Sequence, residues 1–302
     1  MILIKMLVKL TKKNIDENII CRSISEIPNN EILDIINNRI IDIVIGGPPC
    51  QGFSIAGNIG RKFIDDPRNH LFNEFLRVVE LVKPKVFVME NVARLYSHNH
   101  NKTRIEIVEK FALLGYNVKC YVFNAVDFGV PQNRRRVFII GCNNSKIPIR
   151  INAPQHALKT VFDAINDLPN LESGQAFKSI PNHIAMKHTN QMLHKMSFVK
   201  DGGDRSDIPN EIKPSSGDVR KYIRYDSNKP SHTVTGDMRK IFHYSQNRAL
   251  TVRELARLQS FDDSFVFYGN SISQQQQVGN AVPPLMAYEI AKQIKEILQK
   301  YD

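Results

Sequence analysis

The sequence predicts an α/β protein built on a doubly wound parallel sheet, joined to a smaller domain of irregular structure. Two observations carry this prediction. Apolar strands alternate with amphipathic helices between residues 40 and 142, and Pro, Asn, Gly, Ser and His become frequent between about 155 and 245. The chain has 302 residues, which is enough for one large domain and one smaller one.

The first half of the chain supplies the elements of the sheet. Apolar residues recur at helical spacing in 70–84, and Pro84 marks the end of that helix. Gly115 is the expected C-terminal cap of the second helix. The strands are expected at 40–46, 85–92, 118–126 and 135–142, and the helices at 70–84 and 101–118. Parallel sheets of this kind bind ligands at the carboxyl ends of their strands.

The second half begins as loops and ends in helices. Residues 198–218 read as a long irregular loop, which in a compact domain is usually functional or disordered. Thr251 followed by Glu254 forms a capping-box pattern at the start of a helix over 251–261. An amphipathic helix is expected over 282–301. We therefore divide the chain into a first domain (1–158), a second, loop-rich domain (159–270) and a C-terminal segment that returns to the first domain (271–302).

The composition points to a basic protein of a reducing compartment. The formal net charge is +11, which favours a polyanion such as nucleic acid as the partner, although solvated lysines are the plain alternative. No apolar run reaches membrane-spanning length, and residues 1–13 lack the features of a signal peptide. The four cysteines are widely spaced, which argues against a zinc site or a disulfide scaffold. We expect a cytoplasmic, nucleoid-associated protein of a bacterium or archaeon.

The stretch "GGPPCQGFS" (46–54) places Cys50 on a stiff turn after a buried strand. A cysteine is most often an inert small apolar residue. It becomes a nucleophile where a cation or a helix N-terminus favours the thiolate, and this strand-to-helix turn allows that arrangement. Both interpretations of Cys50 follow from the residues alone.

Two further motifs carry charged groups at strand ends. Glu90 in "MENV" ends an apolar strand, where burial raises the pKa of a carboxyl and suits a general acid, or where an arginine pairs with it. In "PQNRRRVF" (131–138), Arg134 and Arg136 are expected to face one side of a strand and to bind an anion or a carbonyl. A solvated basic edge is the alternative.

The order of these motifs is more specific than any one of them. "GGPPCQGFS", "MENV", "VPQNRRRVF", "RALTVRELARLQSF" and "QVGNAVPP" closely resemble the sequential signature of the DNA (cytosine-5) methyltransferases of restriction-modification systems, over roughly residues 20–300. The resemblance implies a Rossmann-like S-adenosyl-L-methionine methyltransferase sheet, double-stranded DNA as substrate and a cognate restriction endonuclease as partner.

The resemblance also implies a mechanism. The thiolate of Cys50 adds to C6 of a cytosine flipped out of the duplex, and Glu90 holds and protonates the ring at N3. Arg134 and Arg136 contact the base carbonyl and order the catalytic loop. The methyl group of S-adenosyl-L-methionine then goes to C5, and no metal is required. The expected chemistry suits a poor electrophile, which needs a soft nucleophile, an acid and a fixed orientation.

Binding residues follow from the same resemblance. The expected cofactor contacts are Ser23, Gly47, Pro48, Leu71, Asn280, Ala281 and Val282. Target recognition is expected within about 160–245, with a short recognition site of about four to six base pairs, since phosphate contacts give affinity and base contacts give sequence choice. The expected DNA contacts are Gln51, Ser54, Arg205, Thr233, Thr235 and Arg239.

The sequence departs from the family at its beginning. The family opens with an Asp-x-Phe-x-Gly-x-Gly-Gly loop and an acidic residue after the next strand; neither is present, and no glycine precedes Gly46. The sheet is thus expected to be incomplete at the N-terminus. Three interpretations follow: a split enzyme with a complementing N-terminal subunit, an inactive DNA-binding remnant, or substitution by the strand-like residues 1–10. A tRNA methyltransferase is disfavoured, because the Cys-Phe-Thr tripeptide of that branch is missing.

Overall fold

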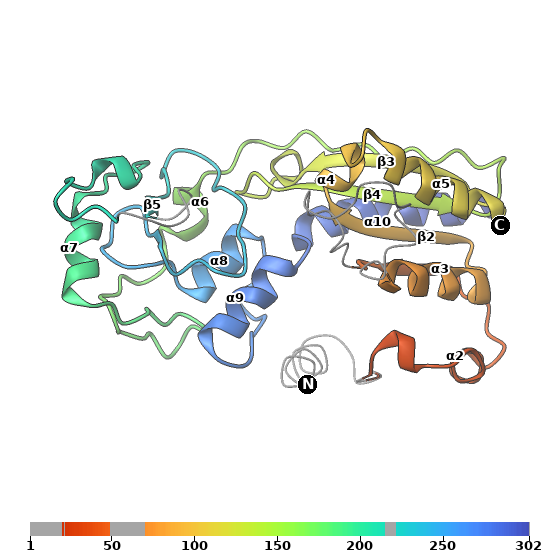
Figure 1. Ribbon diagram of the computed structural model, residues 1–302, viewed down its shortest axis with the longest axis horizontal. Helices are drawn as coiled ribbons and strands as arrows, with labels where there is room; N and C mark the ends of the chain where they lie inside the picture. The colour runs from red at the N-terminus through yellow and green to blue at the C-terminus, as the bar shows by residue number, and fades with distance from the viewer. Residues whose placement is uncertain (1–19, 21, 49–69, 215–221, 302) are drawn as a thin grey trace. The chain divides into compact units, whose positions relative to one another are not determined.

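The computed structural model describes residues 20, 22–48, 70–214 and 222–301. The chain divides into two compact units (Figure 1). The sheet unit comprises Arg22–Asn124, Arg135–Ala153 and Glu289–Asp302, and the loop-rich unit comprises Met1–Cys21, Ala125–Arg134 and Pro154–Tyr288. The units cut the chain differently from the expected domains, since residues 125–134 and 271–288 group with the loop-rich unit.

A four-stranded sheet organises the sheet unit, with the order β1-β2-β4-β3. Its strands are β1 (Ile43–Gly46), β2 (Val86–Val92), β3 (Asn117–Asn124) and β4 (Arg135–Cys142). Only β1 and β2 are parallel; β4 runs antiparallel to both β2 and β3. The expectation of a wholly parallel sheet is therefore wrong for these strands. No crossover helix lies between β3 and β4 in the chain, and a short connection returns the strand antiparallel.

Helices pack one face of this sheet through aromatic rings. The helices and turns of the sheet unit are η1 (Ile24–Glu26), α2 (Asn29–Ile36), α3 (His70–Val82), α4 (Arg94–Ser97), α5 (Lys102–Leu113), the later part of α10 (Pro284–Leu298) and η6 (Gln299–Tyr301). Phe75 of α3 and Phe111 of α5 pack with Phe87 of β2 in one cluster. A Cβ on Gly46 would lie 2.7 Å from the Phe75 ring, so this glycine allows α3 to approach β1.

The loop-rich unit has short elements around a separate core. They are η4 (Ala125–Phe128), α6 (Val161–Ile165), α7 (Asn190–Phe198), η5 (Arg205–Asp207), β5 (Ile223–Arg224), β6 (Ile241–Phe242), α8 (Val252–Leu258), α9 (Ser271–Asn280) and the start of α10. Leu255 of α8, Val278 of α9 and Val234 are fully buried together in its main cluster. The short strands β5 and β6 pair in parallel.

Most of the expected elements lie close to their predicted bounds. The strand expected at 135–142 is β4, and the helix expected at 251–261 is α8, with a capping box at Thr251 and Glu254. Helices α2, α4, α6, α7 and α9 are additional to the prediction. The expected loop 198–218 begins where α7 ends. Its described residues, up to 214, contain the short turn η5 and no other helix or strand.

Candidate active site

The carboxyl ends of β1 and β2 bring together the residues that follow both strands. Gly46 pairs with Met89 in the parallel register, so Gly47 and Glu90 come next to each other. A Cβ on Gly47 would lie 3.3 Å from Oε2 of Glu90. The glycine thus leaves space beside this carboxyl group that any other side chain would enter. Cys50, Gln51 and Ser54 lie outside the described residues.

Asn91 links the two strand ends. Its Nδ2 donates a hydrogen bond of 2.8 Å to the carbonyl of Pro48, and its Oδ1 accepts one of 2.9 Å from the backbone N–H of Val92. The side chain of Asn91 is 6% exposed, so both bonds are sheltered from water. Sequence reasoning quoted the motif that contains Asn91 and missed its role, which depends on the neighbouring strand.

Arg136 holds the carboxyl of Glu90. Val92 pairs with Arg136 and Glu90 with Phe138 in the antiparallel register of β2 and β4, which puts the two charged side chains on one face. Nε of Arg136 lies 2.9 Å from Oε1 of Glu90, and the side chains are 14% and 19% exposed. Burial lowers the pKa of Arg136, while the charge of Glu90 and its hydrogen bond oppose that shift. The ion pair anticipated as the alternative for Glu90 is therefore present, and it fixes the direction of the carboxyl group.

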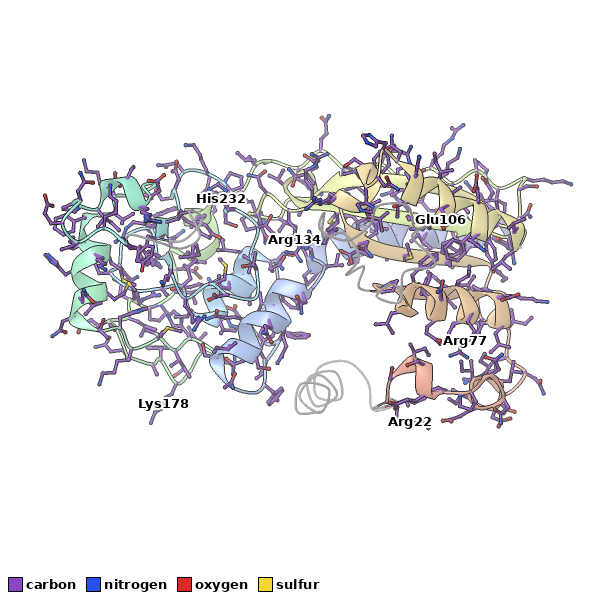
Figure 2. The ribbon with its side chains drawn as sticks, viewed as in Figure 1. Arg22, Arg77, Glu106, Arg134, Lys178 and His232 are labelled. Atoms are coloured by element: carbon purple, nitrogen blue, oxygen red, sulfur yellow. The ribbon has the colours of Figure 1, made fainter. Side chains whose placement is uncertain are left out.

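Arg134 has different partners from Arg136. It precedes β4 and is fully buried in the loop-rich unit (labelled in Figure 2). Its guanidinium donates to the carbonyls of Val234 at 2.9 Å, Gly279 at 2.7 Å and Ala281 at 2.9 Å. The expectation that Arg134 and Arg136 form one anion-binding face is wrong, because the donors of Arg134 are directed to backbone carbonyls.

A buried amide pair reinforces these contacts. Nε2 of Gln132 donates to Oε1 of Gln259 at 3.1 Å, and Nε2 of Gln259 donates to the carbonyl of Val278 at 2.7 Å. Oε1 of Gln132 accepts from the backbone N–H of Val234 at 2.9 Å. Gln132, Gln259 and Arg134 thus join the segment before β4, residues near Val234 and the end of α9. Gln259 was missed, although it lies in the quoted motif "RLQSF".

The expected cofactor contacts are distributed over both units. Leu71 is half-buried in the first turn of α3, and the hydroxyl of Ser23 lies 2.7 Å from that of Ser25. Asn280 is exposed at the end of α9, and Ala281 and Val282 follow it. Within the sheet unit, the space beside Gly47 and the apolar side chain of Leu71 are compatible with an apolar part of a ligand.

The expected DNA contacts of the loop-rich unit have local partners. Oγ1 of Thr233 donates to the carbonyl of Asn133 at 2.7 Å. Thr235 is exposed, and its Oγ1 lies 3.5 Å from the sulfur of Met238. Arg239 pairs with Asp237 at 2.8 Å, and Arg205 is half-buried in η5. The positive charge of Arg239 is thus partly offset by its neighbour, while its side chain stays exposed.

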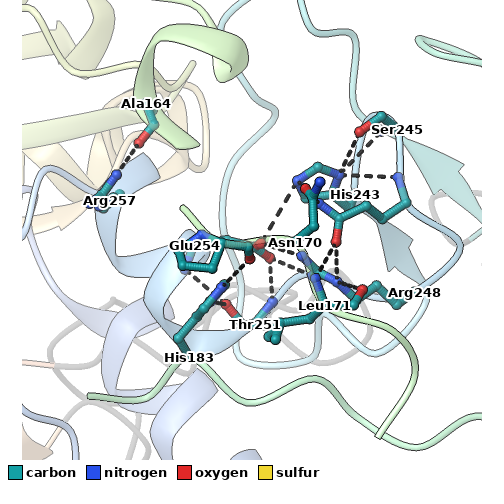
Figure 3. A network of polar contacts seen from close by, with 12 residues as sticks. Ala164, Asn170, Leu171, His183, His243, Ser245, Arg248, Thr251, Glu254 and Arg257 are labelled. Carbon is teal, nitrogen blue, oxygen red and sulfur yellow. Dashed lines mark hydrogen bonds and ion pairs between the residues drawn. The ribbon is translucent and has the colours of Figure 1, made fainter. Parts of the chain in front are cut away.

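A buried network of charged and polar side chains supports α8 (Figure 3). Arg248 binds both carboxylate oxygens of Glu254, at 2.8 and 2.6 Å, and Thr251 caps the helix. Nδ1 of His243 accepts from the backbone N–H groups of Ser245 and Gln246, both at 3.2 Å. Burial lowers the pKa of His243 to about 4, so this imidazole is neutral near pH 7. This network stabilises the unit.

No group of three or more His, Cys, Asp or Glu side chains among the described residues has the arrangement of a metal site. No helix in the described ranges combines the length and apolar character needed to cross a membrane.

Comparisons with known proteins agree on one family. Residues 4–296 match the family model described as C-5 cytosine-specific DNA methylase. The type II methyltransferase M1.HphI of Haemophilus parahaemolyticus is 61% identical over 92% of this chain and 75% of its own length. M.NgoFVII of Neisseria gonorrhoeae is 36% identical over 95% of this chain and 77% of its own.

Solved structures show the same fold. A prophage-encoded protein of E. coli has a TM-score of 0.79 at 24% identity and covers 98% of this chain and 90% of its own. The Entamoeba histolytica methyltransferase EhMeth has a TM-score of 0.63 at 18% identity, over 98% of this chain and 87% of its own. With the family model matched over nearly the whole sequence, the chain belongs to the C-5 cytosine-specific DNA methylases and is a DNA (cytosine-5-)-methyltransferase.

Proposed function

We propose that this chain methylates C5 of cytosine within a short sequence of double-stranded DNA, with S-adenosyl-L-methionine as the methyl donor. One observation carries the proposal: Arg136 holds the carboxyl of Glu90 beside Gly47. Gly47 precedes Cys50 by three residues in the chain. An oriented carboxyl group next to a small space suits recognition of a flat, hydrogen-bonding base.

Cys50, Glu90 and Arg136 have separate roles in the proposed reaction. The thiolate of Cys50 adds to C6 of the flipped cytosine and the π bond between C5 and C6 breaks. Glu90 holds N3 and shares a proton with it, so that the electron pair of this π bond is stabilised over C5 and the ring. Arg136 keeps the carboxyl of Glu90 in place. After methyl transfer, a base removes the proton from C5 and the thiolate leaves C6, which restores the aromatic ring and the free enzyme.

The donor supplies an electrophilic methyl group when bound. Gly47, Pro48 and Leu71 of the sheet unit would hold it. Within the loop-rich unit, Arg134 and Gln259 support the segment that contains Asn280, Ala281 and Val282, because their donors bind the carbonyls of Val278, Gly279 and Ala281. We infer a positioning role for Arg134, in place of direct contact with the base.

A trapping experiment tests the covalent step. The purified chain is incubated with labelled S-adenosyl-L-methionine and duplex DNA in which cytosine is replaced by 5-fluorocytosine, whose fluorine blocks proton removal from C5. We expect a denaturation-resistant protein–DNA adduct that is lost on Cys50→Ser. An adduct that persists in Cys50→Ser would refute the nucleophile, and bisulfite sequencing of unmodified plasmid DNA would identify the target.

The same materials separate active from incomplete enzyme. Equilibrium binding of labelled S-adenosyl-L-methionine to the chain is expected to be measurable without a second protein. Duplex binding without donor binding would instead support an inactive remnant. Methylation that appears only after addition of the product of a neighbouring reading frame would support a split enzyme.

A restriction-modification role follows from the named relatives. M1.HphI, 61% identical, is a type II methyltransferase. We infer that this chain protects host DNA from an endonuclease of the same specificity. Plasmid isolated from cells that express the chain should resist that endonuclease, whereas plasmid from cells that express Cys50→Ser should be cut.

A further inference from the structure

We propose that a second surface of the sheet unit, the basic edge, binds the phosphodiester backbone of the DNA substrate at the carboxyl end of β2, on the face of the sheet opposite to Glu90. The basic edge consists of Arg94, His100, Lys102, Arg104 and Arg135. The proposal rests on the proposed function for the identity of its polyanion. Of its members, only Arg135 lies within the motifs quoted above.

The basic edge and the site residues lie at the same end of the sheet, the carboxyl end of β2. β2 ends at Val92, two residues before Arg94, and Val92 pairs with Arg136. Arg135 pairs with Asn124 and, by strand alternation, faces the side of the sheet opposite to Arg136. That is the side where Leu95 of α4 and Ile107 of α5 pack with Val137. Helices α4 and α5 and Arg135 therefore share one face at the carboxyl end of β2.

The charges of the basic edge are not neutralised locally. Between Glu90 and Glu106 the sequence contains no acidic residue, and Glu106 is on α5 (labelled in Figure 2). Elsewhere carboxylates pair with Arg22, Arg77, Arg136, Arg239, Arg248, Arg253 and Arg257. Among the described residues, none of the five side chains of the basic edge has an ion pair with a carboxylate.

The backbone presents these groups outward in a fixed conformation. Asn99, His100 and Asn101 all have left-handed backbone angles, with φ of 49°, 52° and 70°. The turn is closed by a 2.7 Å hydrogen bond between Nδ1 of His98 and Oγ1 of Thr103. Such a conformation is costly for residues other than glycine, so it is held by its surroundings. Arg94, His100, Lys102 and Arg135 are exposed.

Arg104 is oriented by an aromatic ring. Its guanidinium carbon lies 4.1 Å from the centre of the Tyr96 ring, and the side chain is half-buried. A guanidinium stacked on a ring keeps edge N–H groups available for phosphate oxygens. Basic side chains without carboxylate partners, at the strand end that carries Glu90, fit a phosphodiester backbone better than they fit a neutral or cationic partner.

The salt dependence of duplex binding tests the proposal. The probe is a fluorescein-labelled duplex of about 30 base pairs of mixed sequence, without S-adenosyl-L-methionine, and its affinity is measured by anisotropy over a range of salt concentrations. For Arg94→Gln/Lys102→Gln, the slope of log K against log salt should fall by about 0.9 per lost phosphate contact, which is close to two in all. The affinity at 0.1 M salt should fall roughly eightfold per contact.

Two matched variants sharpen the result. Lys110→Gln removes an exposed lysine of the same helix, eight residues further along α5, and is expected to leave the slope unchanged. Arg94→Lys/Lys102→Arg keeps both charges and is expected to restore the slope. Thermal unfolding of each variant checks the fold; if the double variant misfolds, Lys102→Gln alone should lower the slope by about 0.9.

The outcomes distinguish this proposal from the proposed function. A wild-type slope in the double variant, or an equal loss in Lys110→Gln, overturns the basic edge as a DNA contact. A lowered slope together with failure of the 5-fluorocytosine trap would leave the basic edge as a DNA-binding surface on a chain without the proposed chemistry. A normal yield of the 5-fluorocytosine adduct together with an unchanged slope would support the proposed chemistry and reject the basic edge as a DNA contact.

Discussion

At the scale of single residues, the site depends on a carboxyl group whose position is set by its neighbours. Arg136 bonds to one oxygen of Glu90, and the other oxygen lies close to Gly47. The identity of Glu90 as a candidate was readable from its position in an apolar strand. Its pairing with Arg136 depends on the register of two strands that are more than forty residues apart in the chain.

Gly47→Ala should impair methyl transfer by crowding Glu90. The added Cβ would lie 3.3 Å from Oε2, so the carboxyl or the turn must shift by a few tenths of an ångström. Displacements of about 1 Å cost up to 10²-fold in rate, and we expect a loss in kcat of about tenfold. Steady-state kinetics checks this, with thermal unfolding as the control for the fold; unchanged kcat would show that the space beside Glu90 is not used.

Arg136→Lys should lower kcat although the positive charge is kept. Nε of Arg136 lies 2.9 Å from Oε1 of Glu90, and a lysine has no donor at that point of the side chain. A loss of about 10- to 100-fold is expected from a misdirected catalytic carboxyl. Arg150→Lys, at an exposed position, is the matched control. Equal activity of the two variants would contradict an orienting role for Arg136.

At the scale of elements, hydrophobic periodicity identified α3, α5 and the four strands of the sheet because their buried faces are apolar. It failed for α9, whose buried positions include Ser273, Gln275 and Gln277. Nε2 of Gln277 donates to the carbonyl of Tyr268 at 2.7 Å, and Oε1 of Gln275 accepts from the N–H of Met238. Gln275 and Gln277 therefore form part of an internal polar face of α9.

Helix capping gives a prediction for α8. Oγ1 of Thr251 accepts from the N–H of Glu254 at 3.2 Å and lies 3.1 Å from Nδ1 of His183, with all three residues buried. Thr251→Ala should lower the free energy of unfolding by about 1–2 kcal/mol. Thr160→Ala removes the exposed capping box of α6 and should cost about 0.5–1 kcal/mol. Urea unfolding compares them, and an equal cost would show that burial of the Thr251 cap adds nothing.

At the scale of the whole molecule, the chain combines an α/β sheet unit with a loop-rich unit that has its own core. The loop-rich unit buries charge instead of excluding it. Arg134, Arg248 and Arg253 are each fully buried, and their guanidinium groups bind carbonyls or Glu254. Such a unit should be sensitive to changes in protonation of its buried groups.

Acid should destabilise the protein through His243. Burial lowers its pKa from 6.5 to about 4, so between these values the unfolded chain takes up a proton that the folded chain does not. The free energy of unfolding should fall as the pH drops through this window, by about 3 kcal/mol at about 1.4 kcal/mol per pH unit. The pKa of His188 is also lowered by burial and acts in the same direction.

Urea unfolding at several pH values between 7.5 and 4 measures this effect. His243→Asn should be less stable than wild type near pH 7, and the difference should shrink as the pH falls, because the variant has no imidazole to keep neutral. Glu254, whose carboxylate is held by Arg248, contributes only at lower pH, since its pKa is below the usual value. Parallel stability curves for variant and wild type would contradict the assignment to His243.

The sequence by itself determined the family, the main elements of the sheet and the identity of Glu90 and Arg136 as candidates, because these depend on local periodicity and on the order of short motifs. The tertiary structure decided the antiparallel direction of β4, the partners of Arg134 and the roles of Asn91, Gln259 and the α9 glutamines. These features depend on strand register and on hydrogen bonds between residues distant in the chain, and buried polar groups leave no periodic pattern in the sequence.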